Sequence, residues 1–165
     1  MSDNTSNAQQ NQALIKKFYT AFQNLDAATM AACYHPQATF KDEAFELAGK
    51  DIGAMWSMLC AQAKEFSLEF SAIECTADSG KAHWEPKYLF SMTGNKVHNI
   101  IDAEFEFRDG LIYRHRDHFN FWRWSKQALG LPGTLLGWSG LLKSKVQATA
   151  NKNLQRYISK QVSAS

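Results

Sequence analysis

The sequence of 165 residues predicts one α+β domain, in which helices come first and a strongly bent antiparallel sheet follows. Two observations carry this prediction. Apolar residues recur at helical spacing as far as Ala63, and they then alternate with polar residues from Leu68 to Phe119. Glycine-containing turns separate the alternating segments, as in strands joined by hairpins. A chain of this length buries roughly 70% of its unfolded surface, so it needs no disulfide or metal to fold.

The helical part contains three predicted helices. Apolar side chains at helical spacing define the first helix, and Asp26 is a natural N-cap for the second, which His35-Pro36 terminates. Asp51 is the expected N-cap of the third, whose buried side includes Met55 and Trp56. The helices are expected at residues 13–25, at residues 27–34 and from Asp51 to about residue 63.

Strands and turns alternate in the second part of the chain. Hairpin turns are expected at Asp78-Ser79-Gly80, Thr93-Gly94-Asn95 and Asp109-Gly110. Extended segments are predicted at residues 38–42, around residues 68–70, and at residues 83–92, 97–107 and 111–119. Glycines within residues 130–140 then break the chain before a final helix at about residues 141–159.

Composition and motifs exclude several classes of protein. Residues 1–12 are polar and no apolar run reaches membrane-spanning length, so we expect neither a signal peptide nor a membrane span. The three cysteines are widely spaced, which indicates free thiols in a reducing, cytoplasmic environment. The sequence shows no glycine-rich phosphate loop, no nucleophile elbow and no metal-ligand spacing among its five histidines. We therefore expect no cofactor and no metal.

Charge is distributed unevenly along the chain. The net charge is +2, yet no Asp or Glu follows Asp117, whereas seven Lys and Arg residues do. A basic C-terminal helix can meet phosphates, acidic lipid or an acidic partner, or it can be a solvated helix face. Residues 130–142 are apolar and broken by glycine; they can form a lid, a dimer surface or a membrane-touching segment, or pack on the domain. We do not expect a nucleic-acid partner.

The last predicted strand carries the first candidate for chemistry. Because side chains alternate between the two faces of a sheet, one face should hold Leu111, Tyr113, His115, Asp117 and Phe119. That face is apolar or aromatic apart from its carboxylate and imidazole. A carboxylate there costs several kcal/mol unless it is paired, protonated or functional. Asp117 is therefore predicted to be catalytic, although a salt bridge to a neighbouring arginine would also explain it.

Two further residues are candidates for the same chemistry. His115 can orient Asp117, donate a proton, or be a hydrogen-bonded core histidine. Asp42 lies in a loop between Lys41 and Glu43, where a carboxylate is either functional or simply solvated. Enclosure by aromatic residues would tune Asp117 for proton transfer near neutral pH.

Four residue runs, in this order, also carry a family resemblance. They are Phe18-Tyr-Thr-Ala-Phe, Tyr34-His-Pro-Gln-Ala-Thr-Phe-Lys-Asp, Phe105-Glu-Phe-Arg-Asp-Gly-Leu-Ile and Arg116-Asp-His-Phe-Asn. Together they resemble the nuclear transport factor 2-like superfamily, specifically its SnoaL-like branch. The resemblance implies a cone-shaped roll: a strongly curved antiparallel or mixed sheet wrapped over three N-terminal helices around an apolar pocket, with a C-terminal helix added.

The same resemblance divides the chain into three parts. Residues 1–10 are expected to be a flexible N-terminus, and residues 11–122 the SnoaL-like pocket domain. Residues 123–165 are expected to be a basic helical extension that packs on that domain.

Ketosteroid isomerase, a member of this superfamily, uses three catalytic residues, and this sequence matches only one of them. Asp42 matches its proton-shuttling aspartate, but its tyrosine position is Phe18, with Tyr19 turned by about 100° around the helix. Its second aspartate falls on Ala103. Both oxyanion donors are thus missing, so steroid isomerisation by that scheme is not expected.

Two other branches of the superfamily share Asp117. It matches the last-strand aspartate of limonene-epoxide hydrolase, and His115 falls where that hydrolase has a pocket Trp. The hydrolase's Arg and second Asp fall on Trp84 and Pro86. SnoaL-type cyclases need chiefly one aspartate on the last strand, and this sequence has an aspartate there, Asp117.

The resemblance therefore implies an isomerase, cyclase or hydrolase that acts on a small hydrophobic carbonyl or epoxide through Asp117. The alternative is a non-catalytic small-molecule-binding or dimeric scaffold module of the same fold. Expected partners are a small hydrophobic ligand and a second copy of the chain bound through the outer sheet face. The residues expected to line the pocket are Phe18, Trp84, Tyr88, Phe90, Asn99, Ala103, Phe105, Tyr113 and Phe119.

Overall fold

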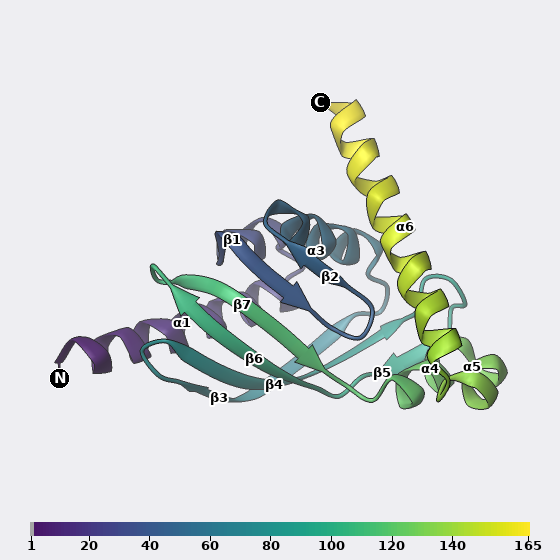
Figure 1. Cartoon of the computed structure of the whole chain (residues 1–165), viewed down its shortest axis with the longest axis horizontal. Coiled ribbons are helices and arrows are strands. Elements are labelled where there is room, and N and C mark those ends of the chain that lie inside the picture. Colours follow the sequence, from purple (N-terminus) through teal and green to yellow (C-terminus); the bar gives the residue numbers. More distant parts are fainter. Residues whose placement is uncertain (1) are drawn as a thin grey trace.

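A curved sheet closes over three N-terminal helices in the computed structural model, which describes residues 2–165 (Figure 1). The helices are α1 (Ser2–Gln23), α2 (Ala27–Ala32), α3 (Lys50–Gln62), α4 (Phe121–Leu129), α5 (Leu131–Leu136) and α6 (Gly140–Ala164). The strands are β1 (Tyr34–Lys41), β2 (Glu46–Ala48), β3 (Ser67–Cys75), β4 (Ser79–Leu89), β5 (Lys96–His98), β6 (Ile101–Arg108) and β7 (Leu111–His118). The predicted α+β fold is thereby confirmed.

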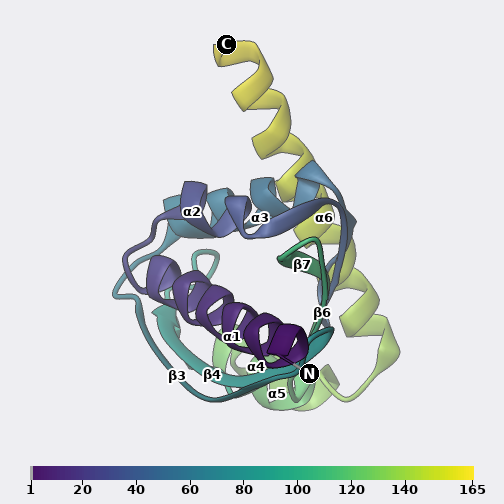
Figure 2. The ribbon, with the colours of Figure 1, turned by 90° about the vertical axis from the view of Figure 1, so that its left-hand side faces the viewer.

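The sheet is mixed, because one of its pairings is parallel. Its strand order is β2-β1-β7-β6-β4-β3, and β5 pairs with the end of β4. Strands β1 and β7 run parallel, whereas every other pairing is antiparallel. Viewed from one end, the sheet bends around α1, with α2 and α3 lying across the open side of the curve (Figure 2). This curvature creates the interior in which the site lies.

A β-bulge interrupts the alternation of β7. Arg114 pairs with Glu106 and Ile112 with Phe107, so Tyr113 is an extra residue on β7. Ile112 is consequently buried, and the half-buried Tyr113 lies against His35 and under the Arg108 guanidinium, 3.7 Å from its ring centre. The predicted single apolar face from Leu111 to Phe119 is therefore wrong before the bulge and holds after it.

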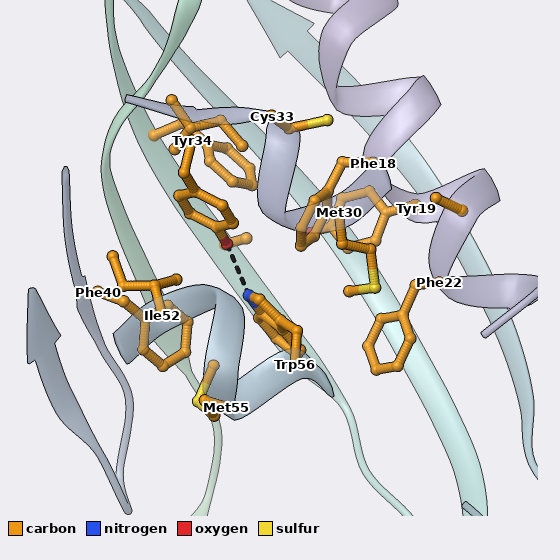
Figure 3. Packing of buried hydrophobic residues seen from close by; sticks show 14 of the residues in the cluster. Phe18, Tyr19, Phe22, Met30, Cys33, Tyr34, Phe40, Ile52, Met55 and Trp56 are labelled. Atoms are coloured by element: carbon orange, nitrogen blue, oxygen red, sulfur yellow. Dashed lines mark hydrogen bonds between the residues drawn. The ribbon is translucent and has the colours of Figure 1, made fainter. Parts of the chain in front are cut away.

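The core between the helices and the sheet is largely aromatic (Figure 3). Phe18 on α1 contacts the ring of Trp56 on α3 edge to face, with ring centres 5.6 Å apart. Phe40 on β1 meets the same indole from another side, at 5.5 Å. These side chains are almost completely buried, so they fix α1, α3 and β1 relative to one another.

Several element boundaries differ from those predicted. Helix α1 begins at Ser2, so residues 2–10 are helical rather than a flexible terminus, while Met1 lies outside the described residues. Asp26 caps α2 by accepting a hydrogen bond from the Thr29 amide, as predicted. The N-cap of α3 is Gly49, not Asp51, which lies in the first turn of that helix.

The predicted strand at residues 97–107 is divided in two. Asn99 donates its backbone N–H to the carbonyl of Pro86, and its Oδ1 accepts from the Ile100 amide. These local hydrogen bonds replace the ladder at the point where β4 changes partner, from β6 to β5. The break turns Asn99 toward the interior, where it is buried.

The C-terminal helices pack against the cone. Leu154 of α6 is fully buried, and the Tyr157 hydroxyl lies 2.9 Å from Ser57 Oγ on α3. Near its other end, α6 is fastened to the β1–β2 turn by an ion pair between Lys143 and Glu43. The last turns of α6 project beyond the body of the molecule (Figure 1).

Replacing Gly133 by alanine should loosen the α4–α5 corner. A Cβ at this position would lie 1.9 Å from the Ser125 carbonyl oxygen, and a backbone atom cannot rotate away. Overpacking of this kind costs about 1–3 kcal/mol, which urea unfolding would measure. The matched control is Gly140→Ala, where a Cβ would meet no atom within 4 Å. Equal stability of the two variants would contradict this packing.

Candidate functional site

A cavity of about 410 Å³ lies between the sheet and the helices that cover it. Its walls come from α3, β4, α4 and α6, and they are mainly aromatic and aliphatic. Four of the lining residues are exposed, namely Gln62, Ser91, Met92 and Lys145, so the cavity reaches solvent, in part beside α6. A volume of this size admits a small organic molecule. The residues that form the apolar wall include Phe22, Phe45, Met55, Trp56, Leu59, Phe66, Phe90, Ile101, Phe119, Leu142 and Val146.

Asp117 contributes a carboxylate to this apolar wall. It lies on β7 opposite Ala103 and is 3% exposed. Its Oδ1 accepts two hydrogen bonds, from Trp84 Nε1 at 3.2 Å and from His115 Nε2 at 2.9 Å. Its Oδ2 accepts none from the residues that the structure describes. One oxygen is therefore fixed in place and the other is free to meet a ligand.

A hydrogen-bonded chain behind Asp117 sets the orientation of His115. Trp56 Nε1 donates to the Tyr34 hydroxyl at 3.0 Å, and that hydroxyl lies 2.7 Å from His115 Nδ1 (the Tyr34–Trp56 bond is drawn in Figure 3). Since the Tyr34 oxygen already accepts from Trp56, its own proton is placed to bond to Nδ1. This assigns the imidazole proton to Nε2, which donates it to Asp117. Burial raises the pKa of Tyr34 well above its usual value, so the hydroxyl keeps its proton.

Aromatic rings enclose His115 on all sides. It is fully buried and does not line the cavity, so it acts on Asp117 from behind. Such packing leaves the imidazole one position, and its Nε2–H points at the carboxylate. Its ring neighbours are Phe18, Tyr34, Phe40, Trp56 and Phe105, at centre distances of 4.5 to 6.3 Å.

Asp42 supplies a second carboxylate to the same cavity. It lies in the turn between β1 and β2, where its Oδ1 accepts from the amides of Ala44 at 2.7 Å and Phe45 at 2.6 Å. Burial, helped by the negative charges of Asp117 and Glu43, raises the pKa of Asp42 to about 7, although the two hydrogen bonds lower it. This carboxyl is therefore poised to give or take a proton near neutral pH.

Two neutral polar groups complete the lining. The Tyr88 hydroxyl accepts from Trp124 Nε1 at 3.0 Å, so its own proton is free to donate to a ligand. Burial raises the pKa of Tyr88 to about 12, with a smaller contribution from Asp42. The side-chain nitrogen of Asn99 has no hydrogen-bond partner among residues 2–165. Both groups can bind a carbonyl or hydroxyl oxygen.

The structure separates the predicted site residues into two groups. Asp117 and Asp42 line the cavity, together with five of the nine predicted lining residues: Trp84, Tyr88, Phe90, Asn99 and Phe119. The other four do not line it. Phe18, Ala103 and Phe105 are buried in the core, and Tyr113 is turned outward by the bulge. The first three side chains belong to the packed core, and the bulge turns the fourth away from the interior.

Other residues occupy the positions that match the oxyanion donors of ketosteroid isomerase and the Arg and second Asp of limonene-epoxide hydrolase, and they have structural roles. Phe18 packs against His115, and the adjacent Tyr19 points its buried hydroxyl into the core, where it has no partner among the described residues. Trp84 holds Asp117, and Pro86 is part of the cavity wall. Neither position supplies an arginine or a carboxylate to activate water.

Some of the site was missed by sequence reasoning. Tyr34 and Trp56, which hold His115, come from β1 and α3, far from β7 in the chain. Leu142 and Val146 of α6, which are not among the predicted lining residues, close the cavity. Helical spacing indicated that Trp56 is buried, but it could not indicate which side chains surround it.

The outer sheet face carries a network of histidines and carboxylates. Glu85 accepts from both His83 and His98, at 2.8 and 2.7 Å, and His83 also bonds to Asp102 at 2.8 Å. Hydrogen bonds to Asp102 and Glu85 raise the pKa of His83. Within residues 2–165, no three His, Cys, Asp or Glu side chains are placed to hold a metal ion. The homodimer expected through this face stays a prediction.

A bent mixed sheet wrapped over three helices, around an apolar cavity with a buried carboxylate, defines the nuclear transport factor 2-like class of α+β cones. Within that class the chain belongs to the SnoaL-like domain family, whose model matches residues 15–115. No curated protein matches the sequence. None of the helices in residues 2–165 is long and apolar enough to cross a membrane.

Several solved structures have the same fold. A LEH-like epoxide hydrolase of M. tuberculosis is 18% identical, with 78% of this chain and 96% of that chain covered and a TM-score of 0.64. A putative polyketide cyclase from a Silicibacter species is 22% identical over 73% of this chain and 96% of that one, with a TM-score of 0.63. A hypothetical protein with a ketosteroid isomerase-like fold from Catenulispora acidiphila, in complex with trimethylamine, is 12% identical over 73% of this chain and 95% of that one, with a TM-score of 0.63. At these identities the likeness shows the fold alone.

Proposed function

We propose that this protein catalyses proton transfer on a small, largely apolar carbonyl compound bound in the cavity. The observation that carries the proposal is the presence of two carboxylates, Asp42 and Asp117, on the wall of one apolar cavity. Their environments differ. Two N–H donors hold Asp117, whereas burial raises the pKa of Asp42 to about 7. Carboxylates placed in unequal environments suit separate roles as base and acid.

The proposed step uses both carboxylates at once. The free Oδ2 of Asp117 takes a proton from the carbon next to the carbonyl, and the electrons of that C–H bond form an enolate. Protonated Asp42 gives its proton to the carbonyl oxygen, so an enol forms and no charge is left on the ligand. Return of a proton at another carbon completes an isomerisation, and attack of the enol carbon on a second carbonyl completes a cyclisation. Donation by Asp42 takes the place of the oxyanion donors missing at Phe18 and Ala103.

Hydrogen exchange tests the chemistry without a known substrate. The native protein, incubated in D2O with a panel of cyclic ketones and enones, should introduce deuterium next to the carbonyl of at least one of them, as read by mass spectrometry. Asp117→Asn should lower that rate about a hundredfold, because general-base catalysis is lost while Oδ1 still accepts from Trp84. Asp102→Asn on the outer face is the matched control and should keep the native rate. Native exchange in the Asp117→Asn variant would overturn the assignment.

The pH dependence of exchange tests the role of Asp42. Since this carboxyl must be protonated to act as the acid, the rate should fall as the pH rises through about 7. Asp42→Asn should be slow and should lack this fall. A native profile that is flat between pH 6 and 8 would exclude Asp42 as the acid.

A second candidate function is ligand binding without reaction. The absence of a donor at Phe18 and Ala103, the family's oxyanion positions, favours it. In that case apolar ligands would raise the melting temperature of the protein, while no member of the panel would exchange hydrogen. An epoxide panel, assayed for diol formation, separates hydrolysis from both candidates.

A further inference from the structure

An exposed apolar surface lies at the corner formed by α4, α5 and the start of α6. We call it the apolar patch; its residues are Trp122, Leu131, Leu135, Leu136, Trp138 and Leu141. All are 42% to 82% exposed, although side chains of this size are usually buried in a soluble domain. The three helices gather at one end of the molecule, away from the N-terminus (Figure 1). A cluster of this kind marks an interaction site.

The packing of α5 directs its large side chains outward. Gly133 and Gly137, one helical turn apart, lie against Ser125 of α4 so closely that no Cβ would fit. Leu131 and Leu135 are therefore on the opposite side of α5, and Trp138 follows one turn later. The Trp138 indole N–H donates to the Leu135 carbonyl at 2.9 Å, which holds the ring at the surface. The glycines thus pack α5 through its small residues and leave its large ones without a partner.

Positive charge accompanies the apolar patch. Lys126 lies over the Trp122 ring, 4.0 Å from its centre. Beyond Leu141, the exposed face of α6 carries Lys145, Lys152, Arg156 and Lys160, which we call the basic stripe. None of its four residues forms an ion pair with any part of the chain that the structure describes. No acidic residue follows Asp117 to neutralise the stripe.

We propose that the apolar patch and the basic stripe bind the protein to the surface of an anionic lipid bilayer. Tryptophan and leucine side chains next to lysines are the composition of helices that lie in a membrane interface. The positive charge of the basic stripe also favours an anionic bilayer as the partner, because each unpaired cation near an anionic surface adds attraction. A second copy seated on the same patch would instead bring two cationic surfaces together. The cavity reaches solvent at Met92 and Lys145, beside the patch, so an apolar ligand could enter it from the bilayer.

Vesicle flotation of the full chain tests the proposal. The protein should float with phosphatidylcholine vesicles that contain phosphatidylglycerol and should stay behind with phosphatidylcholine alone. Leu135→Ser and Trp138→Ser should each weaken binding about tenfold, because an apolar side chain no longer enters the interface. Val162→Ser is the matched control; Val162 is 70% exposed but lies near the other end of α6, and its loss should change nothing.

Charge-reversal variants distinguish vesicle binding through the basic stripe from an effect of the net charge of the protein. Lys152→Glu should weaken binding to anionic vesicles several-fold, whereas Lys16→Glu on α1, with the same change in net charge, should not. Asp117→Asn should bind vesicles as the native chain does, so the outcome is independent of the proposed chemistry. No flotation with anionic vesicles, or binding that Leu135→Ser and Trp138→Ser leave intact, would overturn the proposal. So would sedimentation showing a dimer that these two variants dissociate.

Discussion

Replacing His115 by phenylalanine should destabilise the protein by about 3–5 kcal/mol. The new ring keeps the aromatic packing, but Asp117 loses the Nε2–H donor at 2.9 Å and the Tyr34 hydroxyl loses its acceptor. His115 is fully buried and the phenylalanine ring fills its position, so water cannot take the place of the imidazole. Breaking a buried pair from one side is costly because a charge is left behind uncompensated. Urea unfolding at neutral pH would measure the loss.

A double variant separates the lost pair from a packing defect. In His115→Phe/Asp117→Asn the neutral amide still accepts from Trp84, and no carboxylate is left without its donor. This protein should therefore be more stable than the His115→Phe single variant, although it has one change more. If the second change lowers stability further, steric strain from the phenylalanine is responsible and the pairing argument fails.

Asp42→Asn should stabilise the protein, and the gain should depend on pH. In the native state burial raises the pKa of Asp42 from 3.8 to about 7, so folding favours the neutral carboxyl. Below about pH 4 both states are protonated and the variant gains nothing. Between pH 4 and 7 the unfolded chain loses its proton first, so native stability falls as the pH rises, and above pH 7 the loss is complete. The gain should therefore reach up to about 4 kcal/mol at pH 8.

The measurement is the difference in unfolding free energy between the variant and the native chain at pH 4 and at pH 8. Asparagine keeps the Oδ1 acceptor for the amides of Ala44 and Phe45, so the turn is preserved. Asp3→Asn, an exposed aspartate of α1, is the control and should show no such pH-dependent gain. A gain that is equal at both pH values would show that Asp42 has an ordinary pKa. A pH-dependent gain would agree with a functional role for Asp42, because active-site residues often lower the stability of the folded state.

The order of helices and strands could be predicted because its signals are local. Alternation and glycine turns identify β4, β6 and β7 without knowledge of the fold. The short elements β2, α4 and α5 were not predicted as such. A helix such as α5, of six residues, has little stability of its own and forms because Gly133 and Gly137 dock on α4. That contact joins two segments and leaves no periodic pattern in either.

Part of the candidate site could be predicted for the same reason. Strand alternation placed Asp117 and His115 on an inner face, and both are buried. Alternation could not identify Tyr34, Trp56 and Trp84, whose N–H and O–H groups hold the pair, because they come from three other elements. The family resemblance also placed Phe105 at the pocket, whereas the fold packs it among other aromatic side chains of the core. Strand alternation determines the direction of a side chain, but whether that side chain borders a cavity depends on the other elements packed around it.

The bulge at Tyr113 has a consequence for chain length. If this residue were removed, Ile112 and Arg114 would be neighbours, and each would still pair with the partner it has now, Phe107 and Glu106. Every side chain on either side would keep its face of the sheet, Asp117 included. At this point β7 can therefore change length by one residue without moving the carboxylate, whereas one residue gained or lost elsewhere between Arg114 and Asp117 would turn it to solvent.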